Sequence, residues 1–127
     1  MTLVLDSGAL SALERHDRTT WALLKAAWRD DPDRPVTHGG VVGQVWRGKG
    51  PRSTLLSLAL AGIEVRPLDD TLGRAAGKLL AAAGGSDVID AALVLLARDD
   101  DQIITSDPED LRPLAEAAGR FVELILA

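Results

Sequence analysis

Residues 3–8 read Leu3-Val4-Leu5-Asp6-Ser7-Gly8, three apolar residues followed at once by a carboxylate, a hydroxyl and a glycine. An apolar run of this length is typical of a buried strand, and Ser7 or Gly8 opens a short predicted helix that continues to Leu13. In an open α/β sheet, ligands bind beyond the carboxyl ends of the strands. The sequence therefore places Asp6 at the edge of a sheet where a site is expected.

The same alternation of short apolar runs and helical stretches continues along the rest of the chain. Further strands are predicted at residues 35–37, 63–66, 103–105 and 121–125. Further helices are predicted at residues 17–28, 40–47, 51–62, 69–83, 87–98 and 107–118. Ser86 is the predicted N-cap of the helix that starts at Asp87. This alternation implies a single domain, residues 1–127, built as a three-layer α/β/α sandwich with a mostly parallel central sheet.

Composition limits the classes of function. The 127 residues are 46% apolar, enough for one buried core, and the absence of cysteine excludes a disulfide framework or a thiolate metal site. With 19 acidic and 14 basic residues the net charge is −5, which argues against binding nucleic acid by overall positive charge but not against one local patch. There is no apolar run that could span a bilayer and no basic leader before an apolar stretch. We expect a soluble cytoplasmic protein without a membrane partner.

Aspartates recur where the predicted sheet should offer a site. Asp107 follows the strand at residues 103–105, as Asp6 follows the first strand, and Asp87 and Asp90 share the first turn of one helix. Asp90 lies in an apolar run, where a carboxylate is costly unless an ion or a donor meets it. Carboxylates gathered in this way repel one another, and a divalent cation with a preference for oxygen ligands, Mg²⁺ or Mn²⁺, would relieve that repulsion.

Each aspartate also has an ordinary structural interpretation. Asp6 can be a helix N-cap or a loop residue, and Asp87 can favour the positive end of its helix dipole. Asp107 before a proline is a common helix start, and Asp110 would more often face solvent than a metal. Asp90 is the hardest to explain in structural terms alone. Three aspartates at the expected ends of the sheet favour a metal site.

Three stretches, in this order, resemble the motifs of PIN domains, and the size of the chain resembles the VapC toxins among them. The first runs from Leu3 to Leu10, the second is Ser86-Asp87-Val88-Ile89-Asp90-Ala91-Ala92-Leu93, and the third runs from Thr105 to Leu111. The resemblance covers essentially the whole chain. It implies a Mg²⁺- or Mn²⁺-dependent endoribonuclease that hydrolyses tRNA, rRNA or mRNA. It also implies a cognate antitoxin that neutralises the enzyme, and a homodimer.

The resemblance carries roles to particular residues. The implied metal ligands are Asp6, Asp87, Asp90 and Asp107. The side chains expected to hydrogen-bond these carboxylates or to hold water are Ser7, Thr105, Ser106 and, at the periphery, Asp110. The expected mechanism is attack of a metal-activated water on the phosphodiester, with a carboxylate assisting its deprotonation.

One position departs from the family pattern. The stretch Gly43-Gln44-Val45-Trp46-Arg47-Gly48 matches a family motif that normally carries glutamate where this chain has Gln44. Gln44 can ligate a metal through its carbonyl oxygen or orient water, but it cannot act as a general base. It remains among the predicted catalytic residues, whether the glutamine is natural or engineered.

Gln44 also supports an alternative function. In this alternative the chain is a catalytically weakened or inactive PIN-like module that binds antitoxin or RNA. A third class, a receiver-like signalling domain, lacks the acidic pair expected after the first strand, and Lys78 is poorly placed for its lysine.

A basic segment near Gln44 is the candidate RNA-binding rim. It contains Arg47, Lys49 and Arg52, for which a solvated surface is an equally good interpretation. Trp46 could stack on a base, although its helical spacing with neighbouring valines favours a place in the core. Core packing is likewise the favoured interpretation, and a partner-binding surface the alternative, for most of a further set of apolar residues: Trp21, Leu24, Trp28, Leu55 and Leu58.

Overall fold

The computed structural model describes all residues, 1–127, and has five strands and seven helices. The strands are β1 (Leu3–Leu5), β2 (Val36–His38), β3 (Glu64–Arg66), β4 (Gln102–Thr105) and β5 (Glu123–Leu126). They form one sheet in the order β3-β2-β1-β4-β5, and every neighbouring pair is parallel. The predicted α/β class with a mostly parallel sheet is confirmed.

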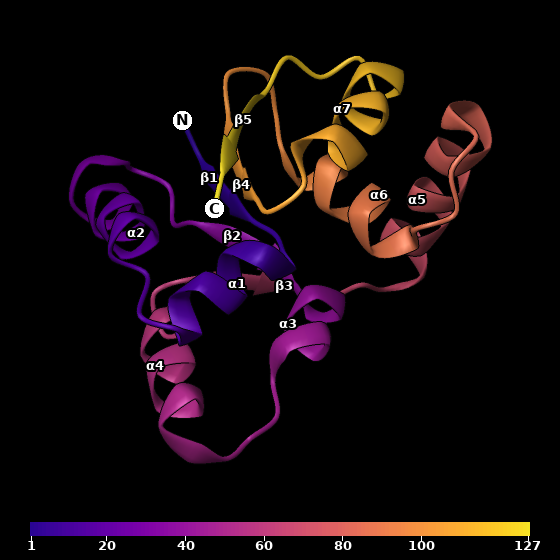
Figure 1. The fold of residues 1–127 in the computed structure, drawn as a ribbon. Coiled ribbons are helices and arrows are strands. Elements are labelled where there is room, and N and C mark those ends of the chain that lie inside the picture. The colour runs from indigo at the N-terminus through magenta and orange to yellow at the C-terminus, as the bar shows by residue number, and fades with distance from the viewer.

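The helices lie on the two faces of this sheet (Figure 1). They are α1 (Ser7–Glu14), α2 (Arg18–Asp30), α3 (Gly39–Val45), α4 (Gly50–Leu60), α5 (Asp70–Ala83), α6 (Val88–Leu96) and α7 (Pro108–Ala117). Helix α1 contacts α2, α3 and α4 on one face, while α5, α6 and α7 contact one another on the other. These contacts give the three-layer α/β/α sandwich that was predicted.

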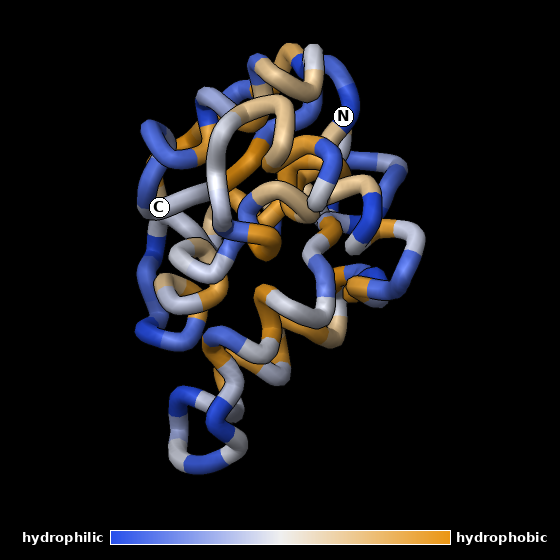
Figure 2. Tube along the Cα trace, turned by 90° about the vertical axis from the view of Figure 1, so that its right-hand side faces the viewer, coloured by the Kyte–Doolittle hydropathy of each residue, from blue (hydrophilic) through white to orange (hydrophobic).

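The two central strands form the middle of the core. All of β1 is buried, and Ile103 and Ile104 of β4 are fully buried beside it. Apolar side chains of α6 cover this part of the sheet, which explains why that helix has little polar character. The hydropathy of the chain follows this arrangement, with apolar segments inside and hydrophilic loops outside (Figure 2).

Aspartate caps explain where several helices begin. The side chains of Asp6, Asp17, Asp69 and Asp87 each accept a hydrogen bond from the backbone N–H three residues later, at the start of α1, α2, α5 and α6. The prediction of Ser86 as the N-cap of α6 was wrong. The helix begins at Val88, so Asp87 is the N-cap, and its side chain accepts the N–H of Asp90 at 3.1 Å.

The structure differs from the prediction at Trp46 and at part of the apolar set that was expected in the core. Helix α3 ends at Val45, and Trp46 has an extended backbone (φ −64°, ψ 128°), so the indole leaves the helical register that favoured core packing. Trp46 is 39% exposed, and the favoured place in the core was wrong. Core packing holds for Leu24, which is fully buried, whereas Trp28 and Leu58 are exposed.

No single helix is long and apolar enough to cross a membrane. Helices α5 and α6 would reach that length and composition only together, and they meet at an angle of 106°.

Candidate active site

The strand order reverses between β1 and β4. Sequence neighbours run outward from β1 to β2 and β3 on one side, and from β4 to β5 on the other. In open α/β sheets such a switch point leaves a crevice beyond the carboxyl ends of the two strands, because the connections leave in opposite directions. The backbone N–H of Asp6 donates to the carbonyl of Ile104 at 3.1 Å, so the residue after β1 stays aligned with the end of β4.

A hollow of about 240 Å³ opens at this point, and we call it the acidic hollow. It is lined by Asp6, Ser7, Gln44, Asp87, Asp90, Thr105, Ser106, Asp107, Asp110 and Leu111. All the residues predicted as metal ligands or as their hydrogen-bonding partners are therefore neighbours, with Gln44 beside them. These residues lie just after β1, in α1 and α3, at the start of α6, and from the end of β4 into α7, so they are far apart in sequence.

Asp6 is the most deeply set of the carboxylates, with 7% of its surface exposed. Its side chain caps α1 by accepting the N–H of Ala9 at 2.9 Å. Burial raises the pKa of Asp6, while hydrogen bonds from the Thr105 hydroxyl and from backbone amides oppose that rise. The N-cap interpretation of Asp6 is thus correct, and it leaves the second carboxylate oxygen free of that bond.

Asp90 carries the largest electrostatic strain in the hollow. Burial, and then the negative charges of Asp87, Asp6 and Asp110, raise the pKa of Asp90 to about 6. A carboxylate in this state is stabilised by any cation that approaches it. The apolar run around Asp90 in the sequence was a sound indication of this environment.

Asp107 and Asp110 form a second carboxylate pair at the mouth of the hollow. The N–H of Asp107 donates to the Thr105 hydroxyl oxygen at 2.9 Å, which fixes the turn between β4 and α7. A hydrogen bond with Asp107, and the negative charge of Asp107, raise the pKa of Asp110. Asp110 is solvent-exposed, as its structural interpretation predicted, and it still borders the hollow.

Close packing between α1 and the β4–α7 turn holds two sides of the hollow together. A Cβ atom on Gly8 would lie 2.2 Å from the Oγ of Ser106 and 2.4 Å from its Cβ. Only glycine allows this approach, because the neighbouring atoms include the Ser106 backbone. The glycine after Asp6-Ser7 is therefore part of how the site is assembled.

His38, which was not predicted as a site residue, holds α3 and α6 together behind the hollow. The side chain is fully buried at the end of β2. Its Nδ1 accepts the N–H of Gly40 at 3.1 Å, so Nε2 carries the proton and donates to the carbonyl of Ile89 at 3.0 Å. Burial lowers the pKa of His38, which keeps the imidazole neutral. The sequence feature that could have indicated this role is a histidine placed directly after a predicted strand and before Gly39-Gly40.

The donor set of the hollow suits a hard divalent cation. Five carboxylates line it and no lysine, arginine or histidine does. No group of three or more acidic or histidine side chains is close enough to form a complete cage for a metal. This arrangement fits Mg²⁺ or Mn²⁺ held by one or two carboxylates with several waters, which is how Mg²⁺ usually binds at phosphate-processing sites.

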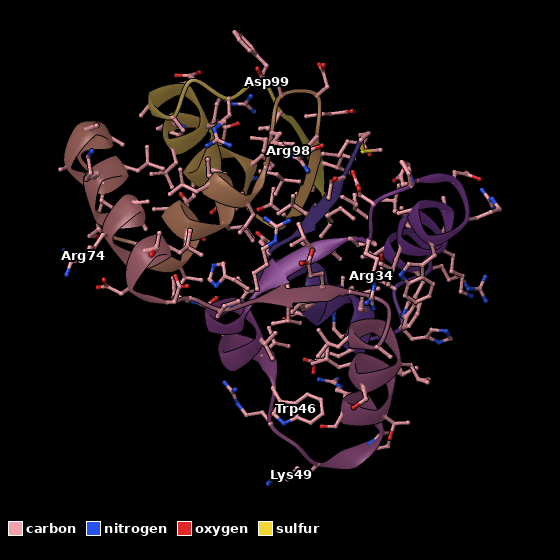
Figure 3. All side chains as sticks on the ribbon, turned by 180° about the vertical axis from the view of Figure 1, so that it is seen from behind. Arg34, Trp46, Lys49, Arg74, Arg98 and Asp99 are labelled. Carbon is pink, nitrogen blue, oxygen red and sulfur yellow. The ribbon has the colours of Figure 1, made fainter.

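None of the predicted RNA-binding residues lines the hollow. Lys49 is at the tip of the loop between α3 and α4, with Trp46 nearer the helices (Figure 3). The Arg47 guanidinium donates to the carbonyls of Gly43, Gln44 and Trp46, at 3.4, 3.2 and 2.8 Å, and so caps the C-terminal end of α3. Lys49 and Arg52 are exposed, and the loop projects from the body of the molecule (Figure 2).

The strand order and the acidic hollow define a doubly wound α/β protein with a carboxylate-lined site at its switch point. The chain shares its fold with a chain of the crystal structure of VapBC2 from Rickettsia felis bound to a DNA fragment from their promoter, with a TM-score of 0.70. The two are 12% identical, and the superposition covers 98% of each chain. No protein-family profile and no curated protein matches the sequence.

Proposed function

We propose that this chain is a Mg²⁺- or Mn²⁺-dependent endoribonuclease and acts as the toxin of a toxin–antitoxin pair. The observation that carries the proposal is the acidic hollow, with five carboxylates and no basic side chain at the switch point of the sheet. The fold shared with a chain of the VapBC2 structure supports the toxin–antitoxin setting. An antitoxin partner, a homodimer and a place in the cytoplasm belong to the same proposal.

The residues of the hollow would have different roles in this reaction. Asp6, Asp90, Asp107 and Asp87 are the side chains that would hold the cation, directly or through water. When bound, the cation neutralises a phosphate oxygen and lowers the pKa of a water. Ser7, Thr105 and Ser106 would orient the carboxylates through their hydroxyl groups. Gln44 would orient a water through its amide, because it cannot take a proton.

Cleavage of a mixed tRNA and rRNA pool tests this proposal. The wild-type chain, Gln44→Glu and Asp90→Asn are compared with Mg²⁺, with Mn²⁺ and with EDTA. We expect metal-dependent cleavage by the wild type, at least as much by Gln44→Glu, and loss of about 100-fold or more in Asp90→Asn. Absence of cleavage by the wild type and by both variants, with either metal, would overturn the enzyme proposal.

The second candidate function is a binding module without catalysis, and Gln44 is the observation that favours it. Helix α3 brings an amide to the hollow where the family pattern has a carboxylate, so one acidic ligand is missing. Cleavage by Gln44→Glu but not by the wild type would mean that the fold is a nuclease whose present form is disabled. RNA binding by an inactive wild-type chain would then be measured directly.

A further inference from the structure

A second hollow, of about 340 Å³, adjoins the acidic hollow, and we call it the side groove. It lies between the end of α5, residues 84–86 and α7. Helix α7 contacts both α5 and α6 there, and all three lie on the same face of the sheet (Figure 1). Asp87, Asp90 and Asp110 line both hollows, so the side groove is continuous with the candidate active site.

The walls of the side groove exclude a phosphate and suit a neutral ring. Leu80, Ala83 and Leu114 supply its apolar surface, with Pro113 beside them. Its charged lining groups are all carboxylates, so a sugar–phosphate segment would be repelled there. An unstacked nucleobase is the part of a single-stranded RNA that is uncharged and flat, and single-stranded bases are commonly recognised by apolar packing with hydrogen bonds to their edges.

Glu109 is the carboxylate that belongs to the side groove alone, since it does not line the acidic hollow. Its Oε1 accepts from Arg112 at 3.1 Å, and its Oε2 has no partner in the protein. A carboxylate accepts hydrogen bonds and donates none when ionised. Guanine presents two adjacent donors, N1–H and N2–H, on its Watson–Crick edge, which match the two oxygens of one carboxylate. Cytosine and adenine each place an acceptor next to their amino group on that edge.

We propose that the side groove is a nucleobase subsite that takes a guanine next to the phosphodiester in the acidic hollow, with Glu109 reading its Watson–Crick edge. The inference rests on the proposed nuclease function and adds a sequence preference to it. Glu109 is then a specificity-determining residue outside the metal site. The expected gain over other bases is about tenfold, within the range for a bidentate base contact.

Mapping of the cleavage ends tests this preference. The wild type, Glu109→Gln and Glu116→Gln are compared on an RNA of mixed sequence with Mg²⁺. Glu116 is an exposed glutamate on the same helix that does not line the groove, so its variant is a matched control. Arg112→Gln removes the ion pair but keeps the Glu109 carboxylate. We expect a guanine preference in the wild type, Glu116→Gln and Arg112→Gln. In Glu109→Gln we expect this roughly tenfold preference to be lost, because cleavage next to guanine slows.

A binding measurement separates this proposal from the nuclease proposal. The four nucleoside 5′-monophosphates are titrated with Mg²⁺ present, and the backbone amide shifts of Gly84 and Gly85 report binding in the groove. We expect the largest shifts with 5′-GMP, and their loss in Glu109→Gln. Cleavage without a guanine preference, or with one that Glu109→Gln keeps, would overturn the subsite and leave the nuclease. Selective 5′-GMP binding without cleavage would support the subsite and overturn the nuclease. If the protein shows neither RNA cleavage nor selective 5′-GMP binding, both proposals are overturned.

Discussion

The imidazole Nε2 of His38 lies 3.0 Å from the carbonyl oxygen of Ile89, the residue that precedes Asp90. The same ring accepts the N–H of Gly40 in α3, the helix that carries Gln44. A Cβ on Gly40 would lie 2.5 Å from the Cδ1 atom of Ile89, so the Ile89 side chain packs against the start of α3. His38 therefore fixes the spacing between two sides of the acidic hollow from behind it.

Replacement of His38 should destabilise the fold. His38→Ala leaves two part-buried backbone groups without their partners and a cavity at the end of β2, so we expect a loss of about 3 kcal/mol in the free energy of unfolding. Urea denaturation measures this value. His16→Asn is the control, because His16 is exposed with φ 62°, a conformation that asparagine tolerates, and a change below about 0.5 kcal/mol is expected. Equal effects of the two variants would contradict the role given to His38.

Asp90 should make the metal-free protein less stable as the pH rises. The folded state holds a proton on Asp90 up to a pKa of about 6, whereas the ordinary pKa of an aspartate is 3.8, so the folded state binds more protons between these limits. Stability from this group is therefore present below pH 4 and is lost as the pH approaches 6. In EDTA, Asp90→Asn should gain about 1–2 kcal/mol relative to the wild type between pH 4 and pH 7, after allowance for solvent screening.

Asp100→Asn is the matched control for that titration, because Asp100 is exposed and has a left-handed backbone (φ 70°) that asparagine accepts. The free energy of unfolding of Asp100→Asn should depend on pH in the same way as that of the wild type. A wild-type protein that becomes steadily more stable relative to Asp90→Asn between pH 4 and pH 7 would show that the carboxylate is not strained in the folded state.

The strand–helix alternation was enough to predict the sheet class, because buried strands and amphipathic helices differ in hydrophobic period. The aspartates of the hollow were also predictable, since each follows a strand or opens a helix. The roles of His38 and Glu109 were not predictable, because they depend on segments distant in sequence that only tertiary packing brings together. His38 contacts the carbonyl of Ile89, and Glu109 lines the side groove with the end of α5. Trp46 was placed wrongly for a similar reason: its helical spacing with Val42 and Val45 continues past the point where the helix ends.

Divalent metal should stabilise the fold through the acidic hollow. At pH 7, Mn²⁺ at about 100 times its dissociation constant should raise the free energy of unfolding by about 2.7 kcal/mol. Asp6→Asn and Asp90→Asn should each weaken Mn²⁺ binding by at least about tenfold in calorimetry, and Asp100→Asn should leave it unchanged. Mn²⁺ binding of equal strength in all four proteins would place the metal outside this hollow.

Two glycines should respond in opposite directions to the same substitution. Gly8→Ala forces a Cβ against Ser106, and we expect a loss of about 1–3 kcal/mol in the free energy of unfolding. Gly77→Ala lies in the exposed interior of α5 with no atom within 4 Å of the new Cβ, and should gain about 0.5–1 kcal/mol. Thermal unfolding compares both with the wild type. If Gly8→Ala leaves the free energy of unfolding unchanged, the β4–α7 turn can move to accommodate the new Cβ. The packing between α1 and this turn would then not fix the site.

Lys49 and Arg52 should contribute to RNA binding through charge alone, while Arg47 should not. Lys49 is exposed on the projecting loop and Arg52 on α4, whereas the Arg47 guanidinium is held by carbonyls at the end of α3.

Affinity for a single-stranded RNA is measured against salt concentration in an Asp90→Asn background, which prevents cleavage. Replacing Lys49 and Arg52 together by alanine should reduce the slope of log K against log salt by about 1.4, or about 0.7 for each phosphate that the protein no longer neutralises. Arg47→Ala should leave the slope in place. An unchanged slope in the double variant would assign these residues to a solvated surface, and a smaller slope in Arg47→Ala would mean that Arg47 leaves its carbonyls for the phosphate.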